Sequence, residues 1–229
     1  MRIKDFILDL IFPKFCLGCG QEGGAWLCWE CLKKILPVQT QVCPACGKIA
    51  EQGKFCRPCR VPSLSGIIVA GYYEEGSLKE IIHNFKYNAV RELGELLGTM
   101  MTTSLEENFS MNKDFLITAV PLHFLRRAKR GYNQSEILAE IIASRLNLEK
   151  NFKTLYKFRG TTAQVQTSGK ERLKNIKNSF KINKKIRLSG RRIILVDDVA
   201  TTGATLQECA RLLKKAGAKE VWGLVAAKG

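Results

Sequence analysis

The sequence predicts an α/β protein in which a domain with a mainly parallel sheet follows a small cysteine-rich domain. From Pro62 onward, short apolar runs alternate with amphipathic helical segments, and this alternation is typical of parallel sheets. Before residue 60 the chain holds eight of its nine cysteines but few large apolar side chains. We therefore expect two domains, at residues 1–62 and 63–229, and a chain of 229 residues with 45% hydrophobic residues is long enough for both.

The first domain contains four C-x-x-C pairs, which supply the thiolates for two tetrahedral metal sites. This spacing favours two closed, structural Zn²⁺ sites, and sequential pairing of the four motifs requires the shortest loops. Interleaved pairing stays open, as do iron and iron–sulfur clusters. Disulfides are disfavoured because the chain shows no secretory signal pattern. Glycines after the second cysteine of two pairs, Gly20 and Gly47, allow tight turns. The expected ligands are Cys16, Cys19, Cys28, Cys31, Cys43, Cys46, Cys56 and Cys59.

Hydrophobic periodicity locates the elements of the second domain. Ser77 and Glu80 form a capping-box pattern that predicts the start of a helix. Strands are expected at residues 67–70, 115–120, 155–158, 193–196 and 221–226, and further helices near 92–106, 134–146, 170–178 and 205–216. The irregular stretch 159–169 is the best candidate for a mobile loop.

The strand at 193–196 is followed at once by two carboxylates and a turn rich in small and hydroxyl residues. Its four bulky apolar residues suit a strand buried on both faces, and ligands of parallel sheets lie at the carboxyl ends of such strands. Asp197 and Asp198 can accept hydrogen bonds from a diol such as that of ribose. The following turn precedes a helix, whose free amides can bind a phosphate. An acidic turn without this function and a magnesium-dependent phosphotransfer site are the alternatives.

A second polar segment follows the strand at 115–120. Residues 123–134 are expected to form a cationic loop, in which Arg126 and Arg130 can bind the oxygens of a pyrophosphate. Asn133 and Glu136 then predict a cap for the next helix.

The thirteen residues 193–205 resemble the phosphoribosyl-pyrophosphate (PRPP) binding motif of type I phosphoribosyltransferases. The resemblance implies a Rossmann-like sheet, ribose binding by the two aspartates, binding of the 5-phosphate by Ala200, Thr201, Thr202, Gly203, Ala204 and Thr205, and Mg²⁺ bound with PRPP. It also assigns Val120, Pro121 and Leu122 to the PRPP site. Catalysis would involve Asp197 and Asp198 together with Arg126, Arg130 and Arg172.

The chain as a whole resembles the ComF family, whose members are cytoplasmic phosphoribosyltransferase-like proteins associated with DNA uptake in competent bacteria. The resemblance rests on the cysteine-rich start, on segments 85–87, 120–122 and 130–134, and on Gln164, Arg172, Asn175 and Phe180 before the PRPP motif. Ala163 and Thr167 depart from the family pattern. The resemblance implies a loop with Arg159, Gln164 and Arg172 that closes over the site and excludes water.

The formal net charge of +16 is unevenly distributed. Residues 170–192 contain ten lysines and arginines and a single acid, Glu171, and a second basic cluster lies at residues 126–130. These clusters favour polyanions such as PRPP or nucleic acid, although a merely solvated basic surface is an alternative. No apolar run is long enough for a membrane span, and the spacing of Ile3, Phe6, Ile7 and Leu10 predicts a short docking helix. We therefore expect a cytoplasmic protein.

Three functional hypotheses follow. The first is an active phosphoribosyltransferase whose acceptor the sequence does not identify. The second is a DNA-uptake protein that binds single-stranded DNA alongside an ATP-dependent DNA helicase or translocase. The third is a PRPP sensor that binds its ligand without turnover. The first two hypotheses are compatible with each other.

Overall fold

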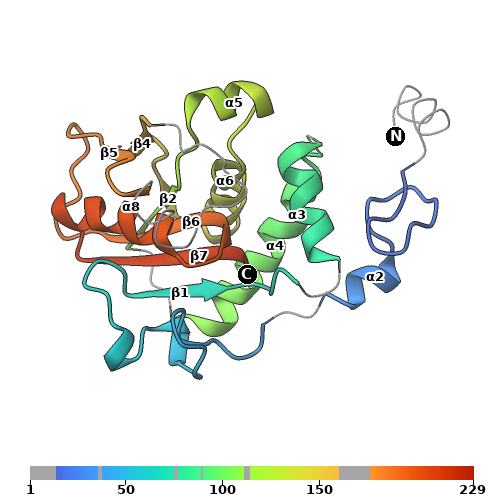
Figure 1. Ribbon diagram of the computed structural model, residues 1–229, viewed down its shortest axis with the longest axis horizontal. Helices are drawn as coiled ribbons and strands as arrows, with labels where there is room; N and C mark the ends of the chain where they lie inside the picture. Colours follow the sequence, from blue (N-terminus) through green and yellow to red (C-terminus); the bar gives the residue numbers. More distant parts are fainter. Residues whose placement is uncertain (1–13, 36–37, 75–76, 89, 111–113, 160–175) are drawn as a thin grey trace.

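A five-stranded sheet forms the centre of the protein, in a computed structural model that describes residues 14–35, 38–74, 77–88, 90–110, 114–159 and 176–229 (Figure 1). The strand order is β1-β7-β6-β2-β3, and every neighbouring pair is parallel. The strands are β1 (Gly66–Val69), β2 (Phe115–Ala119), β3 (Glu149–Lys150), β6 (Arg192–Ala200) and β7 (Glu220–Lys228). The predicted parallel sheet is therefore confirmed.

The central strand β6 is buried on both faces, which accounts for its run of consecutive apolar residues. Ile194 and Val196 belong to one hydrophobic core, whereas Ile193 and Leu195 belong to a second core on the opposite face. The first core is covered by α3 (Leu78–Tyr87), α4 (Leu93–Asn108) and α6 (Gln134–Leu146), and the second by α8 (Ala204–Lys215). A strand covered on both faces needs apolar side chains at consecutive positions.

Two elements differ from the sequence prediction in kind or place. The strand predicted at 155–158 is β4 (Leu155–Lys157), but it lies outside the parallel sheet and pairs antiparallel with β5 (Phe180–Ile182). The cationic loop predicted at 123–134 is instead largely helical, because α5 spans Phe124–Arg130. Its leucine, alanine, lysine and arginine residues are good helix formers, and Gly131 ends the helix in a left-handed conformation with φ +79°.

The helix caps also differ in part from the prediction. Ser77 precedes α3, but its backbone is already helical and its side chain makes no capping hydrogen bond. The predicted capping box is therefore wrong at this position, because a capping side chain needs an extended backbone to reach back to the helix. Asn133 does cap α6, since its side chain accepts a hydrogen bond from the Ser135 amide, while Glu136 pairs with Arg127.

The segment that contains Cys43, Cys46, Cys56 and Cys59 covers the edge of β1 that is not paired with β7. The side-chain amide of Gln41 donates to the Val69 carbonyl at 3.0 Å and accepts from the Val69 amide at 2.9 Å, as a neighbouring strand would. Gly53, with φ +67°, approaches so closely that a Cβ there would lie 2.1 Å from the Ile67 carbonyl oxygen. This contact shields backbone groups that would otherwise be open to another chain.

Several predicted features lie outside the described residues. These are the N-terminal pattern of Ile3, Phe6, Ile7 and Leu10, nearly all of the mobile loop expected at 159–169, most of the helix expected at 170–178, and the loop residues Gln164 and Arg172. Within the ranges that are described, no helix combines the length and apolar character needed to cross a membrane.

Candidate PRPP and metal sites

The carboxylates of Asp197 and Asp198 lie on β6, which continues past the predicted end of the strand to Ala200. Asp197 is held from two sides. Its Oδ1 atom accepts a hydrogen bond from Ser135 Oγ at 2.9 Å and another from the Asp198 amide at 3.0 Å. Ser135 comes from the first turn of α6, so this hydrogen bond joins β6 to the helix that covers it.

Lys86, near the end of α3, contacts the second carboxylate. Its Nζ atom lies 2.8 Å from Asp198 Oδ1, and the exposed fractions of the two side chains are only 18% and 13%. Burial alone lowers the pKa of Lys86, but the carboxylates of Asp198 and Asp197 outweigh this effect and raise it, so the side chain stays an ammonium ion. No sequence pattern indicates a role for Lys86 or Ser135, although Lys86 lies in the segment 85–87 that supports the ComF resemblance.

The environment of Asp197 disfavours its charge. Burial is the largest cause and the neighbouring Asp198 carboxylate the next, and together they raise the pKa of Asp197 from 3.8 to about 7. The Ser135 hydroxyl and the Lys86 ammonium act in the opposite direction. The two carboxyl groups are therefore not equivalent, because Lys86 pairs directly with Asp198.

The turn after β6 forms a small cavity next to Asp197. Thr201 and Thr202 are exposed, and Gly203 adopts φ +71° immediately before α8. The amide of Ala204 donates to Thr202 Oγ1 at 3.4 Å. A cavity of about 50 Å³ is lined by Ile176, Asp197, Val199, Leu206 and residues 200–205. The structure thus places Asp197 and the predicted phosphate-binding turn around one hollow.

The segment after β2 lies beside the same end of the sheet. The amide of Val120 donates to the Val196 carbonyl at 2.9 Å. The segment Val120, Pro121 and Leu122 therefore starts beside the residue that precedes Asp197. Asn133 Nδ2 in turn donates to the Val120 carbonyl at 3.1 Å. This hydrogen bond fixes the two ends of the segment that contains α5.

The cations of this segment differ in their surroundings. Arg130 donates to Gln134 Oε1 at 3.0 Å and lies 4.7 Å from the centre of the Tyr87 ring, next to Lys86. Burial is the largest cause that lowers the pKa of Lys157, and the positive charge of Arg126 is the second. The Asp197 carboxylate acts in the opposite direction. Among the predicted loop residues, Arg159 is exposed and stacks on Phe158 at 5.4 Å.

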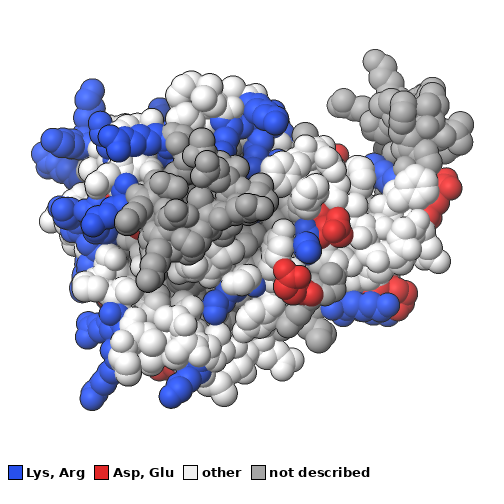
Figure 2. All heavy atoms as spheres, in the orientation of Figure 1, with Lys and Arg blue, Asp and Glu red and all other residues white. Residues whose placement is uncertain are grey.

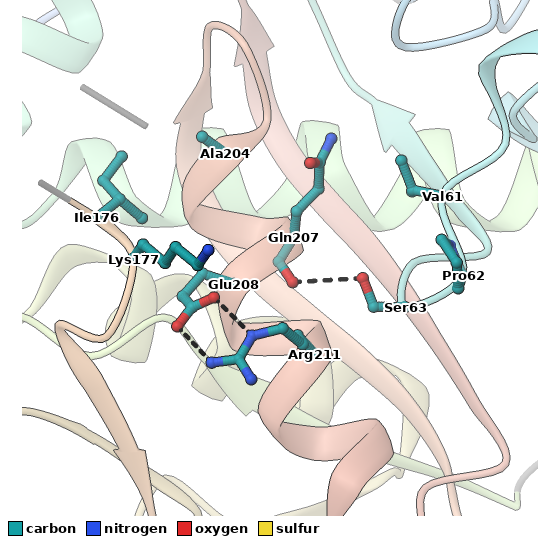
Figure 3. Close-up of a pocket in the computed structure, with 9 residues that line it drawn as sticks. All are labelled: Val61, Pro62, Ser63, Ile176, Lys177, Ala204, Gln207, Glu208 and Arg211. Carbon is teal, nitrogen blue, oxygen red and sulfur yellow. Dashed lines mark hydrogen bonds and ion pairs between the residues drawn. The ribbon is translucent and has the colours of Figure 1, made fainter. Parts of the chain in front are cut away.

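A larger hollow of about 390 Å³ lies on the outer side of α8 (Figure 3). Its lining residues are Val61, Pro62, Ser63, Ile176, Lys177, Ala204, Gln207, Glu208 and Arg211. The Glu208 carboxylate there accepts two hydrogen bonds from Arg211, at 2.7 and 2.8 Å, and one from the Asn178 amide at 2.9 Å. The charged groups on α8 in this hollow thus pair with each other, and we assign it no chemistry.

The eight cysteines before residue 60 form two groups of four, in the sequential pairing. One group is Cys16, Cys19, Cys28 and Cys31, the other is Cys43, Cys46, Cys56 and Cys59, and the sulfurs of each group lie within 4.8 Å of one another. Two sulfurs bound to one zinc ion at roughly 2.3 Å are about 3.8 Å apart in a tetrahedron. The Cys19–Cys28 and Cys46–Cys56 distances are 3.8 and 3.6 Å.

The electrostatics of both cysteine groups fit a divalent cation. Burial raises the pKa of Cys16, but amide donors from Cys28, Cys19 and Gly18 outweigh this effect and lower it to about 6. The pKa of Cys31 rises to about 12, first through burial and then through its neighbouring cysteines. The group thus favours one thiolate and resists further ones until a cation is bound. Gly20 and Gly47 have φ values of +74° and +73°, which confirms the tight turns expected there.

Comparison with known proteins agrees with both parts of the structure. The model of a phosphoribosyl transferase domain matches residues 119–227, and that of a double zinc ribbon domain matches residues 7–60. Competence protein F of Haemophilus influenzae is 31% identical over 210 residues, covering 88% of this chain and 90% of the relative. DNA utilization protein YhgH of Escherichia coli O157:H7 is 28% identical, covering 86% and 96%. Competence protein ComFC of Bacillus subtilis is 27% identical, covering 83% and 79%.

Proposed function

The chain belongs to the ComF family of competence proteins, with a type I phosphoribosyltransferase fold and a double zinc ribbon, and we propose that it binds PRPP and transfers its phosphoribosyl group. The observation that carries the proposal is the hollow that Asp197 shares with the turn at 200–205. A carboxylate pair that accepts from hydroxyls and a helix N-terminus that binds phosphate are the two groups that a ribose 5-phosphate needs.

The proposed binding step changes the partners of Asp198. The ribose 2- and 3-hydroxyls donate to Asp197 and Asp198, so the Lys86 ammonium must share or leave the Asp198 oxygen that it contacts at 2.8 Å. The ammonium then lies beside the bound ligand, where it favours the negative charge of the pyrophosphate. Thr201, Thr202 and Thr205 and the free amides of α8 bind the 5-phosphate.

In the transfer step, the bond between the anomeric carbon and the pyrophosphate oxygen breaks, and an acceptor atom forms a bond to that carbon while losing its proton. Mg²⁺ bound with PRPP would neutralise part of the pyrophosphate charge. We propose that Lys86, Arg126, Arg130 and Arg172 neutralise charge on the departing group. Asp197, with its pKa near 7, is placed to hold or release a proton at neutral pH.

Calorimetric titration tests this proposal. Mg²⁺ and PRPP are titrated into the zinc-loaded protein and into the variant Asp197→Asn/Asp198→Asn. We expect saturable binding by the wild type and at least tenfold weaker binding by the variant. Glu106→Gln/Glu107→Gln is the matched control, because it removes two exposed carboxylates of α4 and changes the net charge equally. Absent wild-type binding, or equal binding by both variants, contradicts the proposal. If PRPP binds, a measurement of pyrophosphate release in the presence of an acceptor then distinguishes a transferase, which releases it, from a sensor, which does not.

We further propose that the protein acts in the cytoplasm during DNA uptake, where it binds single-stranded DNA next to an ATP-dependent helicase or translocase. The names of the relatives, competence protein and DNA utilization protein, and the charge of +16 support this role. Phosphate contacts make such binding steeply dependent on salt. The role is contradicted if the protein does not bind a single-stranded oligonucleotide. It is also contradicted if the affinity does not fall between 50 and 200 mM salt.

A further inference from the structure

The small antiparallel sheet β4–β5 has one buried and one exposed face. Leu155 and Phe180 are both only 3% exposed and pack into the core beneath α8. Tyr156, which lies opposite Lys181 in the pairing, points the other way and is 47% exposed. Phe158 continues the pairing, because its amide donates to the Ser179 carbonyl at 3.1 Å, and it is 37% exposed. Two aromatic rings therefore lie on the outer face of the sheet, about 7 Å apart along the strand.

Cations lie against this exposed face. Lys181 Nζ is 4.3 Å and the Arg159 guanidinium 5.4 Å from the centre of the Phe158 ring. The described stretches that form the sheet and its flanks, 151–159 and 176–190, contain three and five lysines and arginines respectively, and no aspartate or glutamate. Figure 2 shows lysines and arginines gathered at the upper left of the molecule, where Figure 1 places β4 and β5. An acidic partner surface or a polyanion fits such a face, and a basic one does not.

Helix α5 extends the face toward the PRPP site. Phe124 and Leu125 at its start are 66% and 62% exposed, and the next residue is Arg126. The effect of Arg126 on the pKa of Lys157, second only to that of burial, shows that α5 and β4 lie within electrostatic reach of each other. Exposed apolar side chains with a cation nearby thus occur at the start of α5 as well as along β4 and its continuation to Arg159.

We propose that the outer face of β4–β5, together with the start of α5, is a binding surface for single-stranded DNA. Unpaired bases stack on Tyr156, Phe158 and Phe124, while the surrounding lysines and arginines bind the phosphates. This combination of stacking rings and a basic track is how proteins hold single strands without reading their sequence, and in a duplex the base faces are not accessible to such rings. The proposal deepens the proposed role in DNA uptake by locating the DNA, and it is independent of whether PRPP binds.

Fluorescence anisotropy with a labelled 12-mer of thymidine tests the surface. We expect Tyr156→Ala/Phe158→Ala to weaken binding at least about tenfold, because stacking contributes strongly for each base. Lys181→Ala should reduce the slope of log Kd against log salt by about 0.7, the value for one phosphate contact with a single strand. Trp29→Ala is the matched control, since Trp29 is 66% exposed and has Lys33 over its ring at 5.1 Å, but lies on the first ribbon, which contains Cys16, Cys19, Cys28 and Cys31. This variant should bind like the wild type.

Three results would overturn the proposed surface: wild-type protein that does not bind the 12-mer, a double variant that binds as tightly as the wild type, or a loss as large in Trp29→Ala. Far-UV circular dichroism and PRPP titration of each variant verify that the fold and the other site are intact. If the variants bind DNA like the wild type and PRPP binding is also normal, the proposed DNA surface is wrong while the proposed transferase activity is unaffected.

Discussion

Replacing Asp197 with asparagine should change how the stability of the protein depends on pH. Asparagine keeps a side-chain oxygen that can accept hydrogen bonds from the Ser135 hydroxyl and the Asp198 amide, so we expect the local geometry to stay the same. It removes only the group that titrates. In the wild type, burial and the Asp198 carboxylate raise the pKa of Asp197 to about 7 in the folded state, against 3.8 in the unfolded chain.

The sign follows from proton binding. The folded state binds the Asp197 proton more tightly than the unfolded state, so the stabilisation is complete below pH 3.8 and is lost as the pH rises through 7. The whole difference corresponds to about 4 kcal/mol at 1.36 kcal/mol for each tenfold change in proton affinity. Part of it is already lost at pH 5, so roughly 3 kcal/mol remains between pH 5 and pH 8.5.

Urea unfolding of the zinc-loaded proteins at several pH values measures this effect. The free energy of unfolding of the wild type minus that of Asp197→Asn should fall by about 3 kcal/mol from pH 5 to pH 8.5. In Ser135→Ala the fall should be centred at higher pH, because the lost hydroxyl lowers the pKa of Asp197 in the wild type. Parallel pH profiles for the wild type and Asp197→Asn would refute the reasoning.

Three further predictions follow from single contacts. Lys86→Met leaves the Asp198 carboxylate without its ammonium partner and should lower the free energy of unfolding at pH 8 by about 1–3 kcal/mol in urea. The wild type should release two zinc ions per chain to a chromophoric chelator and Cys43→Ser only one, whereas Cys209→Ser, at a buried cysteine outside both groups, should still release two. Gly53→Ala should speed hydrogen exchange at the Val69 amide, because its Cβ would lie 2.1 Å from a β1 carbonyl oxygen; unchanged exchange there would contradict the contact.

Local signals in the sequence were enough to predict several features of this structure. The apolar run at 193–196 does form the central strand, and the spacing of the cysteines did define two groups of four. In both cases the residues that interact are close in sequence or share one strand, so periodicity and spacing contain the information.

Features that depend on distant partners were missed. Lys86 reaches Asp198 from α3, and no local pattern relates a lysine near the end of a helix to a strand far along the chain. The strand at 155–158 was expected correctly, but its antiparallel partner β5 was not, because alternation reveals a strand and not its neighbour. The helix α5 was missed because its cationic composition was interpreted as a loop, although it contains no residue that breaks a helix.

The second ribbon, which contains Cys43, Cys46, Cys56 and Cys59, and the turn at 200–205 both lie close to Ile67. Gly53 packs against the backbone of Ile67, and a Cβ on Gly203 would lie 3.3 Å from the Ile67 side chain. The first ribbon packs elsewhere, through Leu17 and Trp26 against the core that contains α3. If metal binding in the second ribbon helps to hold Ile67 in place, Cys43→Ser should weaken PRPP binding more than Cys16→Ser does. Calorimetry on both variants tests this coupling, since each removes one ligand from one metal site. Equal PRPP affinities would mean that the turn at 200–205 keeps its shape when the second ribbon lacks one of its metal ligands.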